Sequence, residues 1–396
     1  MKKLNIIIYF ILFLLASCSD SNTKKAPSKI ETKEYSSKCN NSIINFEEIL
    51  SDIEDKTTYY LDEYIDTIMI IKLETNDDVL LGDASYVKLS DKYIYVNDMI
   101  HHQFVIFDHN GKYINSLKHG NGPGEFNFIS SFTHNKYTNE LILTDYSSIK
   151  IYSELGEYKK SFDYPNTIKD MITFENGYVC YQTPSWTDED HKSKLIITDF
   201  DFNVKKSFSF DRVYPSIFAP YQLSCNNDTI ICSIHYDDKV YYIKDTTIQV
   251  KYKYELGDYA IKYEDNIDLN SDKYENVSGK FIVDGLYAEC NDYQEIVFDN
   301  NFNRHSIFRN KKTGKMIGGN YNPSSSGLGL FIDYFYLLGT YNNYFCKVLS
   351  RPIVDNKYLE LLSTGNQISQ EDLTKIKEFN MDDNPLIILY SIKGLE

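Results

Sequence analysis

The sequence predicts an all-β chain that folds as a six-bladed β-propeller of four-stranded antiparallel blades. Three observations predict it. Tyr and Phe, which favour strands, supply 35 and 23 of the 396 residues. Short apolar runs of strand length recur in groups of three or four, and such repeats bury their faces only by packing on one another. One further strand-like run stands alone before the first group.

The N-terminus has the features of an export signal. Two lysines precede an apolar run from Leu4 to Leu15, which is too short to span a bilayer but typical of a signal peptide. Leu15-Ala16-Ser17-Cys18 resembles the lipobox of bacterial lipoproteins. That resemblance implies cleavage before Cys18, acylation of this residue and an outer-membrane location, with the leaflet left open. The alternative is an ordinary secretory signal with a chance cysteine.

Composition divides the chain into three parts. Residues 1–17 are the lipoprotein signal peptide. Residues 18–58 are interpreted as a flexible tether, because residues 19–45 are polar, rich in Ser and Lys, and without hydrophobic period. Residues 59–396 are the propeller.

The six groups follow one another along residues 59–396. The second run of each group begins at Tyr93, Leu141, Tyr178, Thr229, Glu295 and Tyr344, at successive spacings of 48, 37, 51, 66 and 49 residues. Turn-forming pairs precede four of these runs, namely Asn139-Glu140, Asn176-Gly177, Asn227-Asp228 and Asn342-Asn343. In the first group, Asn110-Gly111 joins two further runs, which is a strong hairpin signal. Six units of this kind are typical of a propeller.

The last group lacks a fourth strand, and the spare N-terminal run Ile65–Leu73 can supply it. Pairing this run with residues 384–392 would close the ring and remove an exposed edge. One short helix is predicted near residues 369–379, with Ser369 as its N-cap and acidic residues in its first turn.

Charge and cysteine content exclude some classes of function. The formal net charge of −16 opposes binding to nucleic acids, so we expect no nucleic-acid partner. Six cysteines remain besides Cys18. Their even number allows disulfides, but Cys180 and Cys346 lie in matching strand contexts, NGYVC and NNYFC, which favours buried free thiols. Because no CxxC and no Cys/His metal spacing occurs, we expect no cofactor.

The segment His119–Phe126 (HGNGPGEF) predicts a turn into the second blade. A phosphate-binding loop is the alternative, but Pro123 lies inside the segment and no Gly-Lys-Ser/Thr follows. Its residues Gly120–Phe126 resemble the G-x-G-P-G-E-F linkage of a bacterial six-bladed β-propeller lipoprotein family with NHL-like blades, and the closing NPLIILYSIK is similar to that family's last strand. The resemblance covers residues 60–396. It implies a ring on a lipid tether and brings no catalytic residues.

Loops on one face of the predicted ring are the first candidate for a binding surface, because loops on rigid scaffolds carry function. Second-to-third-strand loops and blade-to-blade loops open on that face. They contain aromatic, amide and guanidinium side chains, which suit sugars or peptides: Trp186, Arg212, Tyr214, Phe218, Asn301, Arg304, Tyr321 and Asn322. The predicted function is therefore a non-catalytic binding lipoprotein that engages a glycan, a peptide or an envelope protein.

Three other interpretations stay open at the level of sequence. The first is a metal-dependent hydrolase or lyase in the central channel, with His134 on an inner strand. The second is a Ca²⁺ site at Asp98, Asp145 and Asp299, which end second strands; aspartates in Asx turns would explain them equally. The third is a scaffold within an envelope complex.

Overall fold

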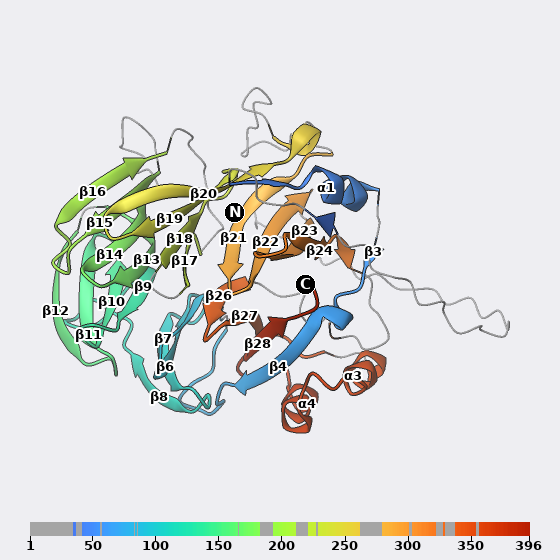
Figure 1. The fold of residues 1–396 in the computed structure, drawn as a ribbon. Helices are drawn as coiled ribbons and strands as arrows, with labels where there is room; N and C mark the ends of the chain where they lie inside the picture. The colour runs from blue at the N-terminus through green and yellow to red at the C-terminus, as the bar shows by residue number, and fades with distance from the viewer. Residues whose placement is uncertain are drawn as a thin grey trace, which may run out of the picture. The chain divides into compact units, whose positions relative to one another are not determined.

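The computed structural model describes residues 35–36, 42–55, 58–82, 84, 86–164, 166–182, 193–210, 221–226, 229–261, 279–300, 303–321, 328, 337–353 and 356–396. All of them belong to one compact unit, Lys33–Glu396. Six four-stranded antiparallel sheets follow one another in a ring (Figure 1), which confirms the predicted propeller.

Blades 1 to 3 are each built from four consecutive strands. Blade 1 contains β5 (Tyr86–Leu89), β6 (Tyr93–Asp98), β7 (Gln103–Asp108) and β8 (Tyr113–Leu117). Blade 2 contains β9 (Ile129–Asn135), β10 (Glu140–Asp145), β11 (Ser148–Ser153) and β12 (Tyr158–Asp163). Blade 3 contains β13 (Ile168–Phe174), β14 (Gly177–Gln182), β15 (Lys194–Thr198) and β16 (Val204–Ser209).

Blades 4 to 6 each include a strand from the N-terminal segment. Blade 4 contains β17 (Leu223–Asn226), β18 (Thr229–Ser233), β19 (Lys239–Lys244), β20 (Thr247–Glu255) and the added β2 (Ile43–Asn45). Blade 5 contains β21 (Ile282–Glu289), β22 (Tyr293–Asn300), β23 (Asn303–Asn310), β24 (Lys315–Gly318) and the added β1 (Tyr35–Ser36). Blade 6 contains β26 (Leu337–Tyr341), β27 (Tyr344–Leu349), β28 (Leu386–Ile392) and β4 (Ile65–Lys72).

The remaining elements lie outside the six blades. A parallel pair joins β3 (Thr58–Tyr59) to β25 (Asn320–Tyr321). Among the described residues, the helices are α1 (Glu47–Glu54), α3 (Asn356–Leu362) and α4 (Gln370–Lys377), with two 3₁₀ turns, η1 (Asp62–Tyr64) and η2 (Gly257–Tyr259). Among the described helices, none is both long enough and apolar enough to cross a membrane.

The ring closes as the sequence predicts. β4 pairs antiparallel with β28, from Ile65 opposite Ile392 to Lys72 opposite Leu386. Strands from the two ends of the chain therefore lie side by side (Figure 1). Ile68 and Ile70 of β4 are buried in the core, so the joint combines a hydrogen-bonded ladder with apolar packing.

Helix α4 confirms the short helix that the sequence predicts near residues 369–379. The Ser369 hydroxyl caps it by accepting a hydrogen bond from the Asp372 N–H at 3.0 Å. Leu373 and Ile376 are buried, because their spacing places them on one face of the helix, and Phe379, which follows the helix, is buried as well.

Residues 42–55, expected within the tether, contribute to the packed ring instead. Ile44, Phe46 and Leu50 are fully buried. The Phe46 ring makes edge-on contacts with the rings of Tyr254 and Phe298, at 5.1 Å and 5.0 Å between ring centres. The backbone N–H of Phe46 donates to Glu255 O at 2.9 Å. The apolar residues of this stretch thus cover strands of blades 4 and 5, and the folded part begins before residue 59.

The segment between blades 1 and 2 is a structural turn. The Gly122 N–H donates to Glu125 Oε2 at 2.8 Å, and the Phe126 N–H donates to Lys118 O at 3.1 Å. A Cβ on Gly124, at φ +76°, would lie 2.7 Å from the Tyr158 Cβ, so this position requires glycine. Strand β9 follows the turn, whereas a phosphate loop would need a helix.

The described cysteines are free thiols. Cys180, Cys232, Cys290 and Cys346 are buried and Cys225 is exposed, while Cys39 lies outside the described residues. Burial raises the pKa of the Cys290 thiol to about 12, so this side chain behaves as a small apolar group.

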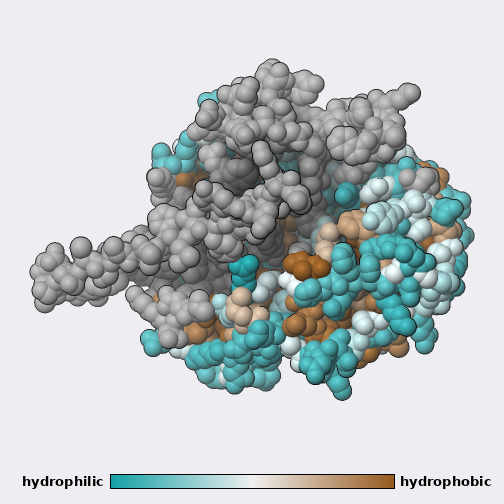
Figure 2. Space-filling model, turned by 180° about the vertical axis from the view of Figure 1, so that it is seen from behind, coloured by the Kyte–Doolittle hydropathy of each residue, from teal (hydrophilic) through white to brown (hydrophobic). Residues whose placement is uncertain are grey.

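The described surface on one face is mostly hydrophilic (Figure 2). Figure 2 shows hydrophilic residues over much of the described surface on one face, with hydrophobic residues gathered mainly toward its middle.

Candidate functional site

The described residues enclose a cavity of about 520 Å³ at one mouth of the central channel, which we call the channel cavity. Its lining comes from the first strand of every blade, namely β5, β9, β13, β17, β21 and β26, and from turns that follow these strands. Because successive strands are antiparallel, this mouth lies at the opposite end of the strands from the second-to-third-strand loops.

One wall of the cavity is fixed by a contact between blades 4 and 1. The Tyr221 hydroxyl accepts a hydrogen bond from the Val87 N–H at 2.7 Å. The same hydroxyl lies 3.4 Å from Val87 O, to which it donates. Burial raises the pKa of Tyr221 well above its usual value, so this hydroxyl stays protonated and rigidly placed.

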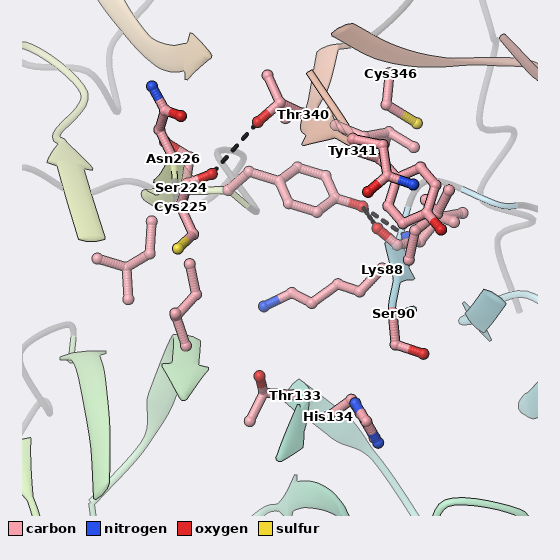
Figure 3. A pocket seen from close by; sticks show the side chains of 18 of the residues that line it. Lys88, Ser90, Thr133, His134, Ser224, Cys225, Asn226, Thr340, Tyr341 and Cys346 are labelled. Carbon is pink, nitrogen blue, oxygen red and sulfur yellow. Dashed lines mark hydrogen bonds between the residues drawn. The ribbon is translucent and has the colours of Figure 1, made fainter. Parts of the chain in front are cut away.

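Lys88 brings a positive charge to the cavity, and a carboxylate compensates it. Its Nζ lies 2.8 Å from Asp170 Oδ1 and donates to Met171 O at 2.9 Å. Asp170 is buried and also accepts the Leu223 N–H at 2.8 Å, so its orientation is fixed from blade 4. Figure 3 shows the Lys88 side chain extended across the cavity.

Glu289 brings a negative charge, which is likewise compensated. Its carboxylate accepts hydrogen bonds from Lys311 Nζ at 2.8 Å, the Tyr287 hydroxyl at 2.6 Å and Asn226 Nδ2 at 3.1 Å. Burial alone would raise the pKa of Glu289, but the hydrogen bonds from Lys311, Tyr242 and Tyr287 together with the charge of Lys311 outweigh it and hold the pKa below its usual value. The carboxylate is therefore ionised and paired at neutral pH.

His134 lies on inner strand β9, as the sequence predicts, and it also lines the cavity. Its ring stacks on Tyr95 at 5.7 Å, and its Nε2 lies 3.7 Å from Glu154 Oε2. Burial lowers the pKa of His134, so the imidazole is neutral at pH 7. In the part of the chain that the structure describes, no three His, Cys, Asp or Glu side chains gather as metal ligands.

Blades 4 to 6 contribute four amides to the lining, which we call the amide sector: Asn226, Asn291, Asn342 and Asn343. Asn343 Oδ1 accepts the Asn291 N–H at 2.6 Å, which links the turns of blades 6 and 5. Asn342 and Asn343 have φ values of 46° and 67°, in the left-handed region that Asn tolerates.

An aromatic side chain borders the amide sector. The Tyr341 ring stacks on His109 at 5.2 Å, and its hydroxyl lies 3.2 Å from His109 Nε2. The neighbouring Thr340 hydroxyl donates to Cys225 O at 3.4 Å, a hydrogen bond that joins blades 6 and 4 (Figure 3).

The loop residues selected from the sequence fall mostly outside the described residues. Those outside are Trp186, Arg212, Tyr214, Phe218, Asn301 and Asn322, and the expected lipidation residue Cys18 also lies outside the described residues. Arg304 begins β23, where its Nε donates to the buried Asp284 Oδ2 at 2.5 Å, at the other end of the blade from the channel cavity. Tyr321 lies in β25, opposite Tyr59 of β3.

Two of the aspartates considered for Ca²⁺ have structural roles. Asp98 accepts the N–H groups of Gly82 at 2.7 Å and Ile100 at 2.9 Å. Asp145 accepts the Phe128 N–H at 2.8 Å and pairs with Lys150 at 2.8 Å. Asp98 thus makes the Asx turn that the alternative interpretation predicts, whereas Asp145 holds the segment that leads into the first strand of its own blade.

Sequence reasoning missed the cavity, although part of its lining carried a signal. Asn342-Asn343 was identified only as a turn pair. The same position in each repeat lies at one mouth of the channel, so polar residues there point to a shared site.

Residues 42–391 match a family described as a domain of unknown function, DUF4934. The chain belongs to this family. The match includes β2 and α1, which agrees with their place in the packed ring. None of the curated proteins matches this DUF4934 chain.

Comparison of the DUF4934 chain with three solved structures gives one match in fold with a TM-score above 0.5. A Bacteroides fragilis protein, named only as a candidate exported protein, has a TM-score of 0.63 and 14% identity over 85% of this chain and 98% of its own. A DUF4221 protein of Bacteroides vulgatus has a TM-score of 0.46 and 11% identity, covering 83% and 98% of the two chains. BamB from Moraxella catarrhalis has a TM-score of 0.42 and 7% identity, covering 82% and 100%.

Proposed function

We propose that this DUF4934 protein is an exported, envelope-anchored binding protein that holds a polar ligand in the channel cavity without transforming it. One observation carries the proposal: the first strands of all six blades supply a polar cavity of about 520 Å³. That volume falls within the range of small-molecule sites, about 300–1,000 Å³. Hydrogen bonds between blades fix its walls, so the site is formed before a ligand arrives.

The proposed location rests on the N-terminal sequence. The signal-like segment and the lipobox-like Leu15–Cys18 support export and acylation of Cys18, and through it attachment to the outer membrane. The likeness to a Bacteroides protein named as a candidate exported protein points in the same direction.

Binding is favoured over catalysis by the state of the ionisable groups in the cavity. Lys88 and Glu289 are each held by an opposite charge at 2.8 Å. A general acid or base needs a titratable group poised near neutral pH and close to the substrate. His134 offers only a neutral ring stacked on Tyr95. The loop residues that include Trp186 and Arg304 stay a prediction for a second contact surface on the opposite face.

A cavity-filling variant tests the proposal. Ser224 of inner strand β17 lines the cavity, so Ser224→Phe should fill part of it. Ser207→Phe, on the exposed outer strand β16, is the matched control. The purified chain is titrated calorimetrically with neutral oligosaccharides and with short peptides. Binding that Ser224→Phe abolishes and Ser207→Phe preserves supports the proposal. Metal-dependent turnover of either panel would contradict it.

A further inference from the structure

We infer that the channel cavity takes a short segment of an uncharged oligosaccharide. This inference rests on the proposed function and names its ligand class. Three properties of the lining carry it: its less exposed charges, Lys88 and Glu289, are paired within the protein while Asp91 and Lys136 are exposed, carboxamide groups gather in the amide sector, and the lining includes a supported aromatic ring.

The paired charges disfavour an ionic ligand. A carboxylate or phosphate on the ligand would have to compete with Asp170 for Lys88, whose Nζ also donates to Met171 O. An ammonium group would have to compete with Lys311 for Glu289. Either exchange leaves a buried charge without its partner, which is costly in a site of low dielectric. A neutral ligand leaves both pairs intact.

The amide sector matches hydroxyl groups. A carboxamide offers two N–H donors and a carbonyl acceptor, and a sugar hydroxyl both donates and accepts. Asn226 already donates to Glu289 Oε1 at 3.1 Å and to Cys290 O at 3.3 Å. The amides of Asn291, Asn342 and Asn343, from the neighbouring blades 5 and 6, therefore provide the pattern that adjacent hydroxyls on one sugar ring require. The Asn343–Asn291 hydrogen bond and the left-handed backbone at Asn342 and Asn343 hold this pattern in place.

An aromatic ring and bare backbone lie beside the amides. Tyr341 is supported from one side by its stacking on His109, which makes it a rigid platform. Sugars present C–H faces that pack on such rings. At Gly339, with φ +125°, an added Cβ would meet nothing within 4 Å, so the backbone next to the platform borders open space. A pyranose ring can therefore approach the main chain there.

A peptide fits the described lining less well. Peptides are held either by strand addition along an open edge or by capture of a charged terminus. The lengths of the lining strands, from four residues in β5 and β17 to eight in β21, do not separate the two ligand classes. The less exposed charges that would capture a terminus are those of Lys88 and Glu289, and these are already paired.

The test combines an isosteric variant with a matched control. Asn343→Asp keeps the oxygen that accepts the Asn291 N–H but removes both amide donors. Asn139→Asp makes the same change in the corresponding turn of blade 2, at φ 51° and outside the lining. Tyr341→Phe keeps the aromatic face and Tyr341→Ala removes it.

The purified chain and its variants are screened on an array of neutral oligosaccharides, with galacturonate trimers and trialanine as charged probes. Positive signals are measured by calorimetry. We expect a neutral oligosaccharide to bind, Asn343→Asp to weaken it roughly tenfold, and Asn139→Asp to change it less than about twofold. Tyr341→Ala should abolish binding and Tyr341→Phe should keep it. Thermal unfolding confirms that each variant is folded.

The outcomes separate the ligand class from the proposed function. If trialanine or galacturonate binds in a manner that Ser224→Phe abolishes, while neutral sugars do not bind, the ligand class is wrong and the binding function stands. If a neutral sugar binds but Asn343→Asp and Tyr341→Ala leave its affinity unchanged, the site is elsewhere and the inference fails. If no probe binds, both are overturned.

Discussion

The buried ion pair between Lys347 and Glu295 provides the sharpest test of how blades 5 and 6 are held together. Lys347 on β27 lies 2.8 Å from Glu295 on β22, and their side chains are 1% and 0% exposed. The Glu295 carboxylate also accepts hydrogen bonds from Ser306 at 2.8 Å and from the Tyr390 hydroxyl. The pair thus joins blade 5 to the blade that closes the ring.

Lys347→Met should destabilise the fold strongly, because it leaves the Glu295 carboxylate buried without its cation. Loss of one partner of a buried pair costs about 3–5 kcal/mol. The double variant Lys347→Met/Glu295→Met should recover most of that loss, since an apolar pair of similar volume removes both desolvated charges. The non-additivity, rather than either single value, measures the coupling.

Urea unfolding followed by tyrosine fluorescence and circular dichroism gives the free energies. Lys312→Met is the matched control, because Lys312 pairs with Asp292 at 2.7 Å but its side chain is 76% exposed. An exposed pair contributes about 0–1 kcal/mol. A Lys347→Met variant as stable as Lys312→Met, or a double variant no more stable than Lys347→Met, would refute the reasoning.

Three further predictions concern closure, packing and pH. Ile68→Ala in the closing strand β4 should cost about 2–5 kcal/mol of unfolding free energy by calorimetry, because the side chain is 1% exposed; a loss below about 1 kcal/mol would show that β4 does not close the ring. Phe46→Ala should cost about 3–5 kcal/mol in urea, because the ring packs on blades 4 and 5; an unchanged midpoint would place residues 42–55 outside the folded unit. Burial lowers the pKa of His305, so its native state binds the proton more weakly than the unfolded state. The stability this contributes is complete above about pH 6.5 and is lost as pH falls through the lowered pKa. Unfolding free energy measured from pH 7.5 to 5 should fall less steeply in His305→Gln than in the unchanged chain, and equal slopes would contradict the assignment.

The blade pattern could be predicted because its signals are local. Strand-length apolar runs, the Asn110-Gly111 hairpin and the Ser369 cap each depend on residues close together in sequence. Closure by residues 65–72 could also be inferred, because the last blade lacks a fourth strand and the N-terminal part of the propeller has one spare strand. Pairing the two leaves no exposed strand edge. The helix and strand in residues 42–55 were missed, because the five apolar residues that are buried there follow directly on a polar stretch that resembles a tether.

The channel cavity could not be predicted from local pattern. Lys88 and Asp170 are 82 residues apart, and Asn343 and Asn291 are 52 residues apart. No periodicity connects such residues; only the curvature of the ring brings them to one mouth of the channel. The residues selected from the sequence therefore came from the second-to-third-strand and blade-to-blade loops, which lie on the face opposite the described cavity.

The sequence by itself determined the all-β repeat, the order of the blades and the strand that closes them, because each depends on propensity and pattern along the chain. Tertiary structure alone decided which polar residues share a cavity and which charges are compensated inside it. The reason is physical: hydrogen bonds and ion pairs act over about 3 Å in space, and a ring of sheets sets those distances without regard to separation in sequence.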